Sequence, residues 1–396
     1  MRRRKEEGSR GERRWFFQRV YALPRLRIAL LPVSSRLSVP ASVAAPLAVG
    51  ALVCMAMAFA AGVGPMSLIR TVWSGSWGSP DAAINTLTRM TPLLCTGLAV
   101  ALAYRAGLLN IGCEGQLTIG ALVSASFAVA TPNLPGFLLL PITLAAGAAS
   151  GCLWALPAIL LRQRRGVHEV ISTLMLNYVA IYLCSYLVSG PLGDGTAMGR
   201  TPPIPAGAEM PEILRNGSLF LTAAPLIALL LCFGARLRLS KTVWGFEMRA
   251  AGINFDAAVN AGIPAANRQI GVFLGSGALA GLAGALEVCA VHHRFYRSFS
   301  PGYGFDGLTA SFLANGSPGW LWLSTLFMAS LRSADKMLQI GLNLSPNSIL
   351  VAQAVLLLSV ACQGRIRERI EKFSSKVGGS LRKNVSTLQS DRADAL

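Results

Sequence analysis

The chain has 396 residues, of which 53% are hydrophobic and 14% are charged, and its 36 Lys and Arg against 18 Asp and Glu give a net charge of +18. A soluble domain carries about 25% charged residues, so this composition excludes a disordered chain, a secreted disulfide scaffold and an ordinary cytosolic enzyme. The same shortage of polar surface argues against a nucleic-acid partner despite the basic charge. The apolar excess indicates a membrane protein, and since a spanning helix takes roughly 20 residues, about ten spans would use half of the chain.

The first 40 residues are rich in arginine and are interpreted as a basic cytoplasmic tail, because they are too long and too charged for a typical signal peptide. The uncharged stretch 41–63 is long enough to cross a membrane. The segment 64–90 mixes apolar residues with Arg70, Asp81 and Arg89, and this pattern predicts a loop with an amphipathic helix.

Further apolar runs predict spans at 91–109, 116–131, 136–161, 169–190, 218–235, 269–291, 318–333 and 346–362. The short segment 306–315 has the length of half a helix. Counting it as a crossing gives ten spans. If both tails are cytoplasmic, the number of spans must be even, and ten satisfies this. We therefore expect an all-α polytopic membrane protein: a transmembrane domain over 41–363 followed by a second basic cytoplasmic tail over 364–396.

Loop charge predicts the orientation, because Lys and Arg near span ends stay in the cytoplasm. The loops predicted to be cytoplasmic carry the following basic residues: Arg162, Arg164, Arg165, Arg236, Arg238, Lys241, Arg249 and Arg268. The loop 191–217 instead balances its charges and is rich in Pro and Gly, as an outer loop can be. The basic charge of the tails and of these loops is expected to fix the orientation and to contact anionic membrane lipid.

The eight cysteines are scattered singly and form no C-x-x-C pair, which argues against a metal or redox site. They are better interpreted as small apolar residues in helix packing. A membrane-embedded enzyme would need a catalytic cluster, and His168-Glu169 is the nearest approach to one.

Two polar interruptions of the apolar pattern each contain an acid–Gly pair, and each pair is followed closely by Leu-Thr. The pairs are Glu114-Gly115 and Asp306-Gly307. A break in the helix near Glu114 would present a helix N-terminus at membrane depth, which is how many transporters build a substrate site. The alternative is a tight cytoplasmic turn in which Glu114 caps the next helix. The recurrence of the pair in opposite halves of the chain predicts two related halves containing broken or half helices.

A third polar cluster contains Ser172, Thr173 and Asn177 within the run 169–190. These side chains either face the substrate or form hydrogen bonds between packed helices, and the second role is the commoner one in membrane bundles.

The long cytoplasmic loop 236–268 contains signals for a short helix: Asn254 is a suitable N-cap, Asp256 favours a helix start, and Gly262 before Ile-Pro is a suitable stop. A helix of about two turns is marginal by itself. It therefore needs a surface to dock against, either a partner protein or the lipid surface.

Together these segments resemble one family, the ATP-binding-cassette (ABC) importer permeases for nucleosides and simple sugars, related to the ribose permeases. The resemblance covers about residues 82–362 and rests on the runs Thr86–Pro92, Gly97–Gln116, Glu169–Tyr178, Arg249–Ile263 and Gly304–Gly307. Asp256-Ala257-Ala258 and Gly262 stand where such permeases carry Glu-Ala-Ala and Gly. Cys113 in place of a small Ala, and the 311–318 turn, depart from the family pattern.

The resemblance implies a transport subunit that is not an enzyme, has no cofactor or metal of its own, and moves nucleosides or related sugars by alternating access. ATP is then used by a separate ATPase; the other partners are a second permease subunit and an extracytoplasmic substrate-binding lipoprotein, in a bacterial plasma membrane. The candidate residues of the substrate path are Asn110, Glu114, Gln116, Asn177, Phe305 and Asp306. Those of the ATPase-coupling segment are Arg249, Gly252, Asn254, Asp256, Ala257, Ala258 and Gly262.

The main rival is a secondary transporter in which Glu114 and Asp306 carry protons down an ion gradient. It predicts uptake that stops when the gradient collapses, and it leaves the 236–268 loop unexplained.

Overall fold

The computed structural model of the protein describes residues 64–216 and 219–342, together with Leu52, Met55, Phe59 and Ala354. The predicted tails, 1–40 and 364–396, lie outside the described residues. So do all but those four positions of the predicted spans 41–63 and 346–362.

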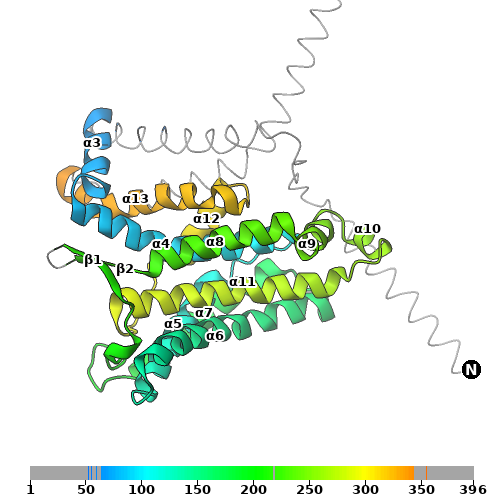
Figure 1. The fold of residues 1–396 in the computed structure, drawn as a ribbon, viewed down its shortest axis with the longest axis horizontal. Coiled ribbons are helices and arrows are strands. Elements are labelled where there is room, and N and C mark those ends of the chain that lie inside the picture. The colour runs from blue at the N-terminus through cyan, green and yellow to red at the C-terminus, as the bar shows by residue number, and fades with distance from the viewer. Residues whose placement is uncertain are drawn as a thin grey trace, which may run out of the picture. The chain divides into compact units, whose positions relative to one another are not determined.

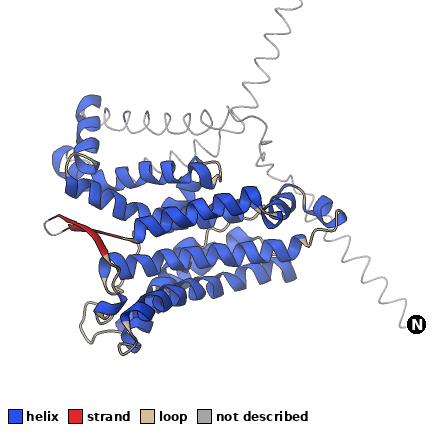
Figure 2. Cartoon of the chain, in the orientation of Figure 1, coloured by secondary structure: helices blue, strands red, loops and turns tan. Residues whose placement is uncertain are grey.

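The described chain is mainly helical (Figures 1 and 2). Its first helices are α3 (Pro65–Ser76), α4 (Pro80–Arg105), α5 (Cys113–Ala130), α6 (Gly136–Arg165) and α7 (Glu169–Ser189). A loop with the short helix η1 (Ala206–Ala208) leads to strands β1 (Glu212–Asn216) and β2 (Leu219–Thr222). The remaining elements are α8 (Ala224–Lys241), α9 (Val243–Ile253), α10 (Phe255–Asn260), α11 (Ala265–Glu287), η2 (Val288–His292), α12 (Tyr303–Leu313) and α13 (Pro318–Leu342).

The segment 64–90 is more helical than its mixed composition predicts. It contains α3 and the first turns of α4, which start well before the apolar run at 91. Ser79 caps α4 by accepting a hydrogen bond from the backbone N–H of Ala82 at 3.1 Å, and Pro80 and Asp81 occupy the first turn. A cap, an N-terminal proline and an acidic first turn together outweigh the lower hydropathy of this stretch.

The expectation of an all-α chain is wrong in one place, where β1 and β2 form an antiparallel hairpin. Within the apolar run predicted to span 218–235, the described residues therefore become helical only at Ala224. Leu219–Thr222 instead pairs with the polar strand that precedes it, and Pro225 then occupies the first turn of α8. An apolar run of this length cannot distinguish a strand from a helix by its hydropathy alone.

Five of the described helices are long and apolar enough to cross a membrane: α4, α5, α6, α7, and α11 continued by η2. The half helix predicted over 306–315 is confirmed as α12, which has 11 residues. The chain is thus a helical protein with several candidate spans, and the total of ten stays a prediction.

Helix α11 lies at the centre of the bundle, in contact with α4, α5 and α6. Glycines bring these backbones together: a Cβ at Gly281 would collide with the carbonyl oxygen of Gly147, and one at Gly151 with that of Gly277. Small residues permit this close approach, which replaces the hydrophobic effect as a source of helix association in lipid.

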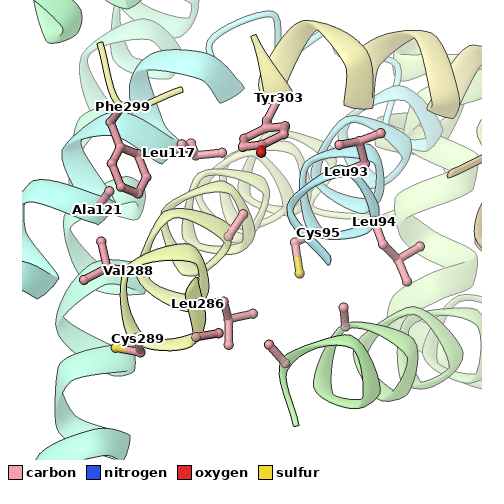
Figure 3. Close-up of a cluster of buried hydrophobic side chains, with 14 of the residues drawn as sticks. Leu93, Leu94, Cys95, Leu117, Ala121, Leu286, Val288, Cys289, Phe299 and Tyr303 are labelled. Carbon is pink, nitrogen blue, oxygen red and sulfur yellow. The ribbon is translucent and has the colours of Figure 1, made fainter. Parts of the chain in front are cut away.

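The larger buried side chains gather between α4, α5 and α11, with Phe299 and Tyr303 from the loop before α12 and its first turn (Figure 3). Leu93, Leu94 and Leu117 are at most 1% exposed there. The bundle has two distinct ends: α9 and α10 lie at one, and the β1–β2 hairpin lies at the other (Figure 1). We call these the α9–α10 end and the hairpin end.

Candidate functional site

The predicted helix break is confirmed, because α4 ends at Arg105 and α5 begins at Cys113. The side chains of Asn110 and Gln116 hold the segment between them in a reciprocal amide pair, with N···O distances of 2.9 and 3.2 Å. Asn110 also donates to Ser276 on α11 at 2.8 Å and accepts from the backbone N–H of Gly112 at 2.9 Å. The side chains of Asn110, Gln116 and Ser276 therefore hold the break with hydrogen bonds from within the protein.

Asn177 on α7 forms hydrogen bonds with the backbone of the segment that joins α4 to α5. Its amide nitrogen donates to the carbonyl of Ile111 and its amide oxygen accepts from the N–H of Gly115, each at 2.8 Å. Asn177 is thus the hydrogen-bonding link between packed helices that its position predicts. Ser172 and Thr173 differ, because their hydroxyls bond to the carbonyl of Glu169 within their own helix.

The N-termini of α5 and α12 meet at the centre of this region. The carboxylate of Glu114 accepts a hydrogen bond at 2.7 Å from the N–H of Gly304 in the first turn of α12. A Cβ at Gly304 would collide with the backbone of Glu114, so only glycine allows this approach. Glu114 therefore caps the half helix α12 from the opposite half of the chain, while it also lies in the first turn of its own helix, α5, where the helix dipole favours an acid.

Asp306 forms a different contact. Its carboxylate pairs with the Arg332 guanidinium of α13 at 2.6 Å, and Arg332 also donates to the carbonyl of Pro301 at 3.3 Å. Both side chains of the pair are largely buried, with exposures of 5% and 11%. Arg332 is a charge inside the predicted span 318–333, and such charges mark functional or structural partners; that signal could have identified it.

Five of the six predicted path residues are less than 5% exposed: Asn110, Glu114, Gln116, Asn177 and Asp306. Asn110 and Gln116 bond to each other, Asn177 bonds to the backbone of the same segment, and Glu114 links that segment to α12. Phe305 is the exception, with 39% of its surface exposed. That these residues line a substrate path stays a prediction.

The 236–268 loop contains the predicted short helix and a longer one before it. Asn254 caps α10 by accepting from the N–H of Ala257 at 3.1 Å, and Gly262 ends the turn with a φ of +80°. Ala258 is buried, whereas Phe255 and Val259 are 41% and 49% exposed. Helix α10 therefore packs against the protein through Ala258 and exposes the apolar side chains of Phe255 and Val259.

Helix α9 holds the loop against the transmembrane bundle. Glu247 pairs with Arg268 of α11 at 2.6 Å, and the Arg238 guanidinium of α8 lies 4.3 Å from the Trp244 ring centroid. Gly252 contacts the backbone of Arg105 so closely that a Cβ would collide with its carbonyl oxygen. The loop therefore touches the end of α4 where the helix break begins.

Arg105 extends that contact to the second half helix. Its guanidinium donates to the carbonyls of Gly316 at 2.8 Å and Asn315 at 3.3 Å, in the turn between α12 and α13. Gln269 of α11 adds a hydrogen bond at 3.0 Å to the carbonyl of Ala106. Neither Arg105 nor Gln269 was among the candidate residues predicted from the sequence. Arg105 could have been identified, because it is a charged residue at the end of an apolar run.

The sequence matches a permease family, described as the branched-chain amino acid transport system / permease component, over residues 82–360. It is 32% identical to the glucose ABC transporter permease protein TsgB13 of Haloferax volcanii, over 80% of this chain and 84% of the relative. It is 31% identical to the guanosine ABC transporter permease protein NupP of Bacillus subtilis, over 83% of this chain and 94% of that one.

The nucleoside ABC transporter permease protein NupB of Lactococcus lactis is 29% identical, over 82% of this chain and 90% of the relative. No solved structure matches the chain. The helix break, the half helix and the packed 236–268 loop lie inside the matched range of 82–360. The chain therefore belongs to this permease family of ABC transport systems, as a multi-pass membrane subunit that is not an enzyme.

Proposed function

We propose that this chain is the permease subunit of an ABC importer that moves nucleosides or related simple sugars across a bacterial plasma membrane. The observation that carries the proposal is the similarity, over four fifths of the chain, to permeases named for guanosine, nucleosides and glucose. ATP would be bound and hydrolysed by a separate cytoplasmic ATPase. A second permease subunit and an extracytoplasmic substrate-binding lipoprotein would complete the transporter.

The α9–α10 end supports an orientation toward the cytoplasm. It carries eight basic residues, Arg162, Arg164, Arg165, Arg236, Arg238, Lys241, Arg249 and Arg268, in the loops and helix ends that gather there. Basic residues near span ends are retained in the cytoplasm. The hairpin end would then face the outside, and both tails would be cytoplasmic.

The exposed side chains of α10 suit a groove on the ATPase. A six-residue helix is unstable alone, and Phe255 and Val259 present an apolar surface next to the exposed carboxylate of Asp256. In this proposal Arg249, Gly252, Asn254, Asp256, Ala257, Ala258 and Gly262 form the coupling segment.

The contacts of α9 suggest how movement of the ATPase reaches the membrane. A shift of α9 acts on Arg105 through Gly252, and Arg105 is bonded to the turn that ends α12. The two helices that meet at Glu114 and Gly304 are thus both reached from the coupling segment. Alternating access follows when paired permease subunits rock apart on one side and close on the other.

The fixed partners of Glu114 and Asp306 favour the ABC importer over a gradient-driven transporter. Each carboxylate is engaged, one with a backbone N–H and one with Arg332. A proton carrier must instead release its partner during each cycle.

The test is affinity purification of the tagged chain from membranes in which its neighbouring transport genes are expressed, followed by assay for a bound ATPase. Val259→Asp, on exposed α10, should abolish the association. Ile213→Asp, at a strand residue of similar exposure at the hairpin end, is the matched control and should retain it. Uptake of radiolabelled guanosine and glucose should require the ATPase and survive collapse of the proton gradient. Failure to recover an ATPase, or uptake that stops with the gradient, would overturn the proposal.

A further inference from the structure

The outward faces of the described helices differ in chemistry. On α6 the exposed side chains are apolar as far as Leu161, and on α8 they are apolar as far as Phe233. Such faces suit lipid, which offers no hydrogen bonds. Helix α7 is different: beside Ile171, Met175 and Val179 it exposes three tyrosines.

Three of the seven tyrosines of the chain lie on one stripe of α7. Tyr178, Tyr182 and Tyr186 are four residues apart, so they share one face over about 12 Å of the helix axis. They are 51%, 71% and 71% exposed. Within the described part of the chain, no hydrogen bond engages their hydroxyls. Tyrosines that anchor a protein in lipid sit at the membrane interface, whereas Tyr178 lies in the middle of α7.

The stripe ends in a hollow of about 290 Å³ at the hairpin end, lined by Ser185, Tyr186, Ser189, Gly190 and Arg297. Arg297 is exposed, and its guanidinium has no ion-pair or hydrogen-bond partner among the described residues. The nearby cation Arg200 is paired with Asp194 at 2.7 Å. Hydrogen bonds from Thr196, together with Arg200, lower the pKa of Asp194 to about 2, so that pair stays charged at neutral pH.

The hollow combines an aromatic ring, two serine hydroxyls and a guanidinium. An aromatic face packs against the apolar face of a sugar or a base, and hydroxyl and guanidinium groups bond to ring hydroxyls. We propose that this hollow, continued along α7 by Tyr182 and Tyr178, is a binding subsite for a polyhydroxylated ring, either a free sugar or the ribose of a nucleoside. The inference rests on the proposed function and adds to it the place where the solute first meets this subunit.

Thiol labelling tests the subsite directly. In the complete transporter, Ser189→Cys should react with a membrane-impermeant thiol reagent, and saturating guanosine or glucose should slow the reaction at least threefold. Phe233→Cys, on the apolar face of α8, is the matched control and should not react. A Ser189→Cys thiol that stays unreactive, or one that reacts equally fast with and without both solutes, would overturn the subsite.

Uptake measurements supply a second test that does not depend on labelling. Tyr186→Ala should lower uptake below saturation by about fivefold, and Tyr186→Phe, which keeps the ring, by about twofold. Arg297→Gln should act like Tyr186→Ala, whereas Phe233→Ala should leave uptake unchanged. Normal uptake in both Tyr186→Ala and Arg297→Gln, with the ATPase still bound, would overturn the subsite proposal but not the proposed function. A wild-type transporter that takes up neither solute would instead remove the proposed function.

Discussion

Helices α5 and α12 each carry an acid–Gly pair close to their first residue, yet the two carboxylates have different partners. Glu114 accepts a hydrogen bond from the backbone of Gly304, whereas Asp306 pairs with the charged side chain of Arg332. The glycines are more alike: Gly115 packs against Asn177, and Gly307 packs against Thr96. The shared motif therefore encodes close helix approach, and the role of the acid depends on which element faces it.

The largest effect should come from breaking the charge pair on the α12 side. Asp306→Ala leaves the Arg332 guanidinium without its carboxylate in a largely buried site, which costs about 3–5 kcal/mol. Thermal unfolding of the purified transporter in detergent measures the loss. Asp306→Ala combined with Arg332→Leu should recover most of it, because no uncompensated charge remains. A single variant as stable as the wild type would show that the pair contributes little.

The contact between the two helix starts should be nearly as sensitive. Gly304→Ala places a Cβ against the backbone of Glu114, and the displacement should cost about 1–3 kcal/mol. Gly271→Ala on α11 is the matched control, because a Cβ there meets nothing within 4 Å; helix propensity should make it neutral or stabilising by up to about 1 kcal/mol. Equal effects of the two substitutions in the same unfolding assay would contradict the close approach.

On the α5 side, removal of the Asn177 amide should have an intermediate effect. Asn177→Ala leaves the N–H of Gly115 and the carbonyl of Ile111 without their partner, at a cost of about 1–3 kcal/mol. Ser172→Ala is the control, since that hydroxyl bonds only within its own helix. Unfolding in increasing concentrations of a denaturing detergent compares the stabilities of the two variants. An Asn177→Ala variant as stable as Ser172→Ala would show that the hydrogen bonds of Asn177 contribute little to the stability of the break.

The smallest effect should come from Glu114→Gln. The amide oxygen can still accept the hydrogen bond of Gly304, so only the extra strength of a charged acceptor is lost, about 1 kcal/mol. The comparison predicts that this substitution is milder than Asp306→Asn, in which a buried Arg332 loses its counter-charge. The unfolding temperatures of the two variants provide the measurement. A lower unfolding temperature for Glu114→Gln than for Asp306→Asn would contradict this assignment of partners to the two acids.

The membrane class, the break before Glu114, the half helix near Asp306 and the capped helix after Asn254 could all be predicted from the amino-acid sequence. Each of these depends on local signals: long apolar runs, costly charges inside them, and residues that start or stop a helix. The permease family was predicted from the resemblance of several motifs. The local signals failed at 64–90, where helix capping outweighed hydropathy, and at 219–222, where strand pairing did.

The contacts of the polar residues became known only from the three-dimensional structure. Glu114 and Gly304 are far apart in the sequence, as are Arg105 and Gly316, so no local pattern could pair them. Hydropathy likewise could not show that five of the predicted path residues turn inward while the tyrosines of α7 turn outward, because exposure depends on which helices pack together. Which polar and aromatic side chains reach the surface is therefore defined by the packing of the bundle, and it became visible only in the folded chain.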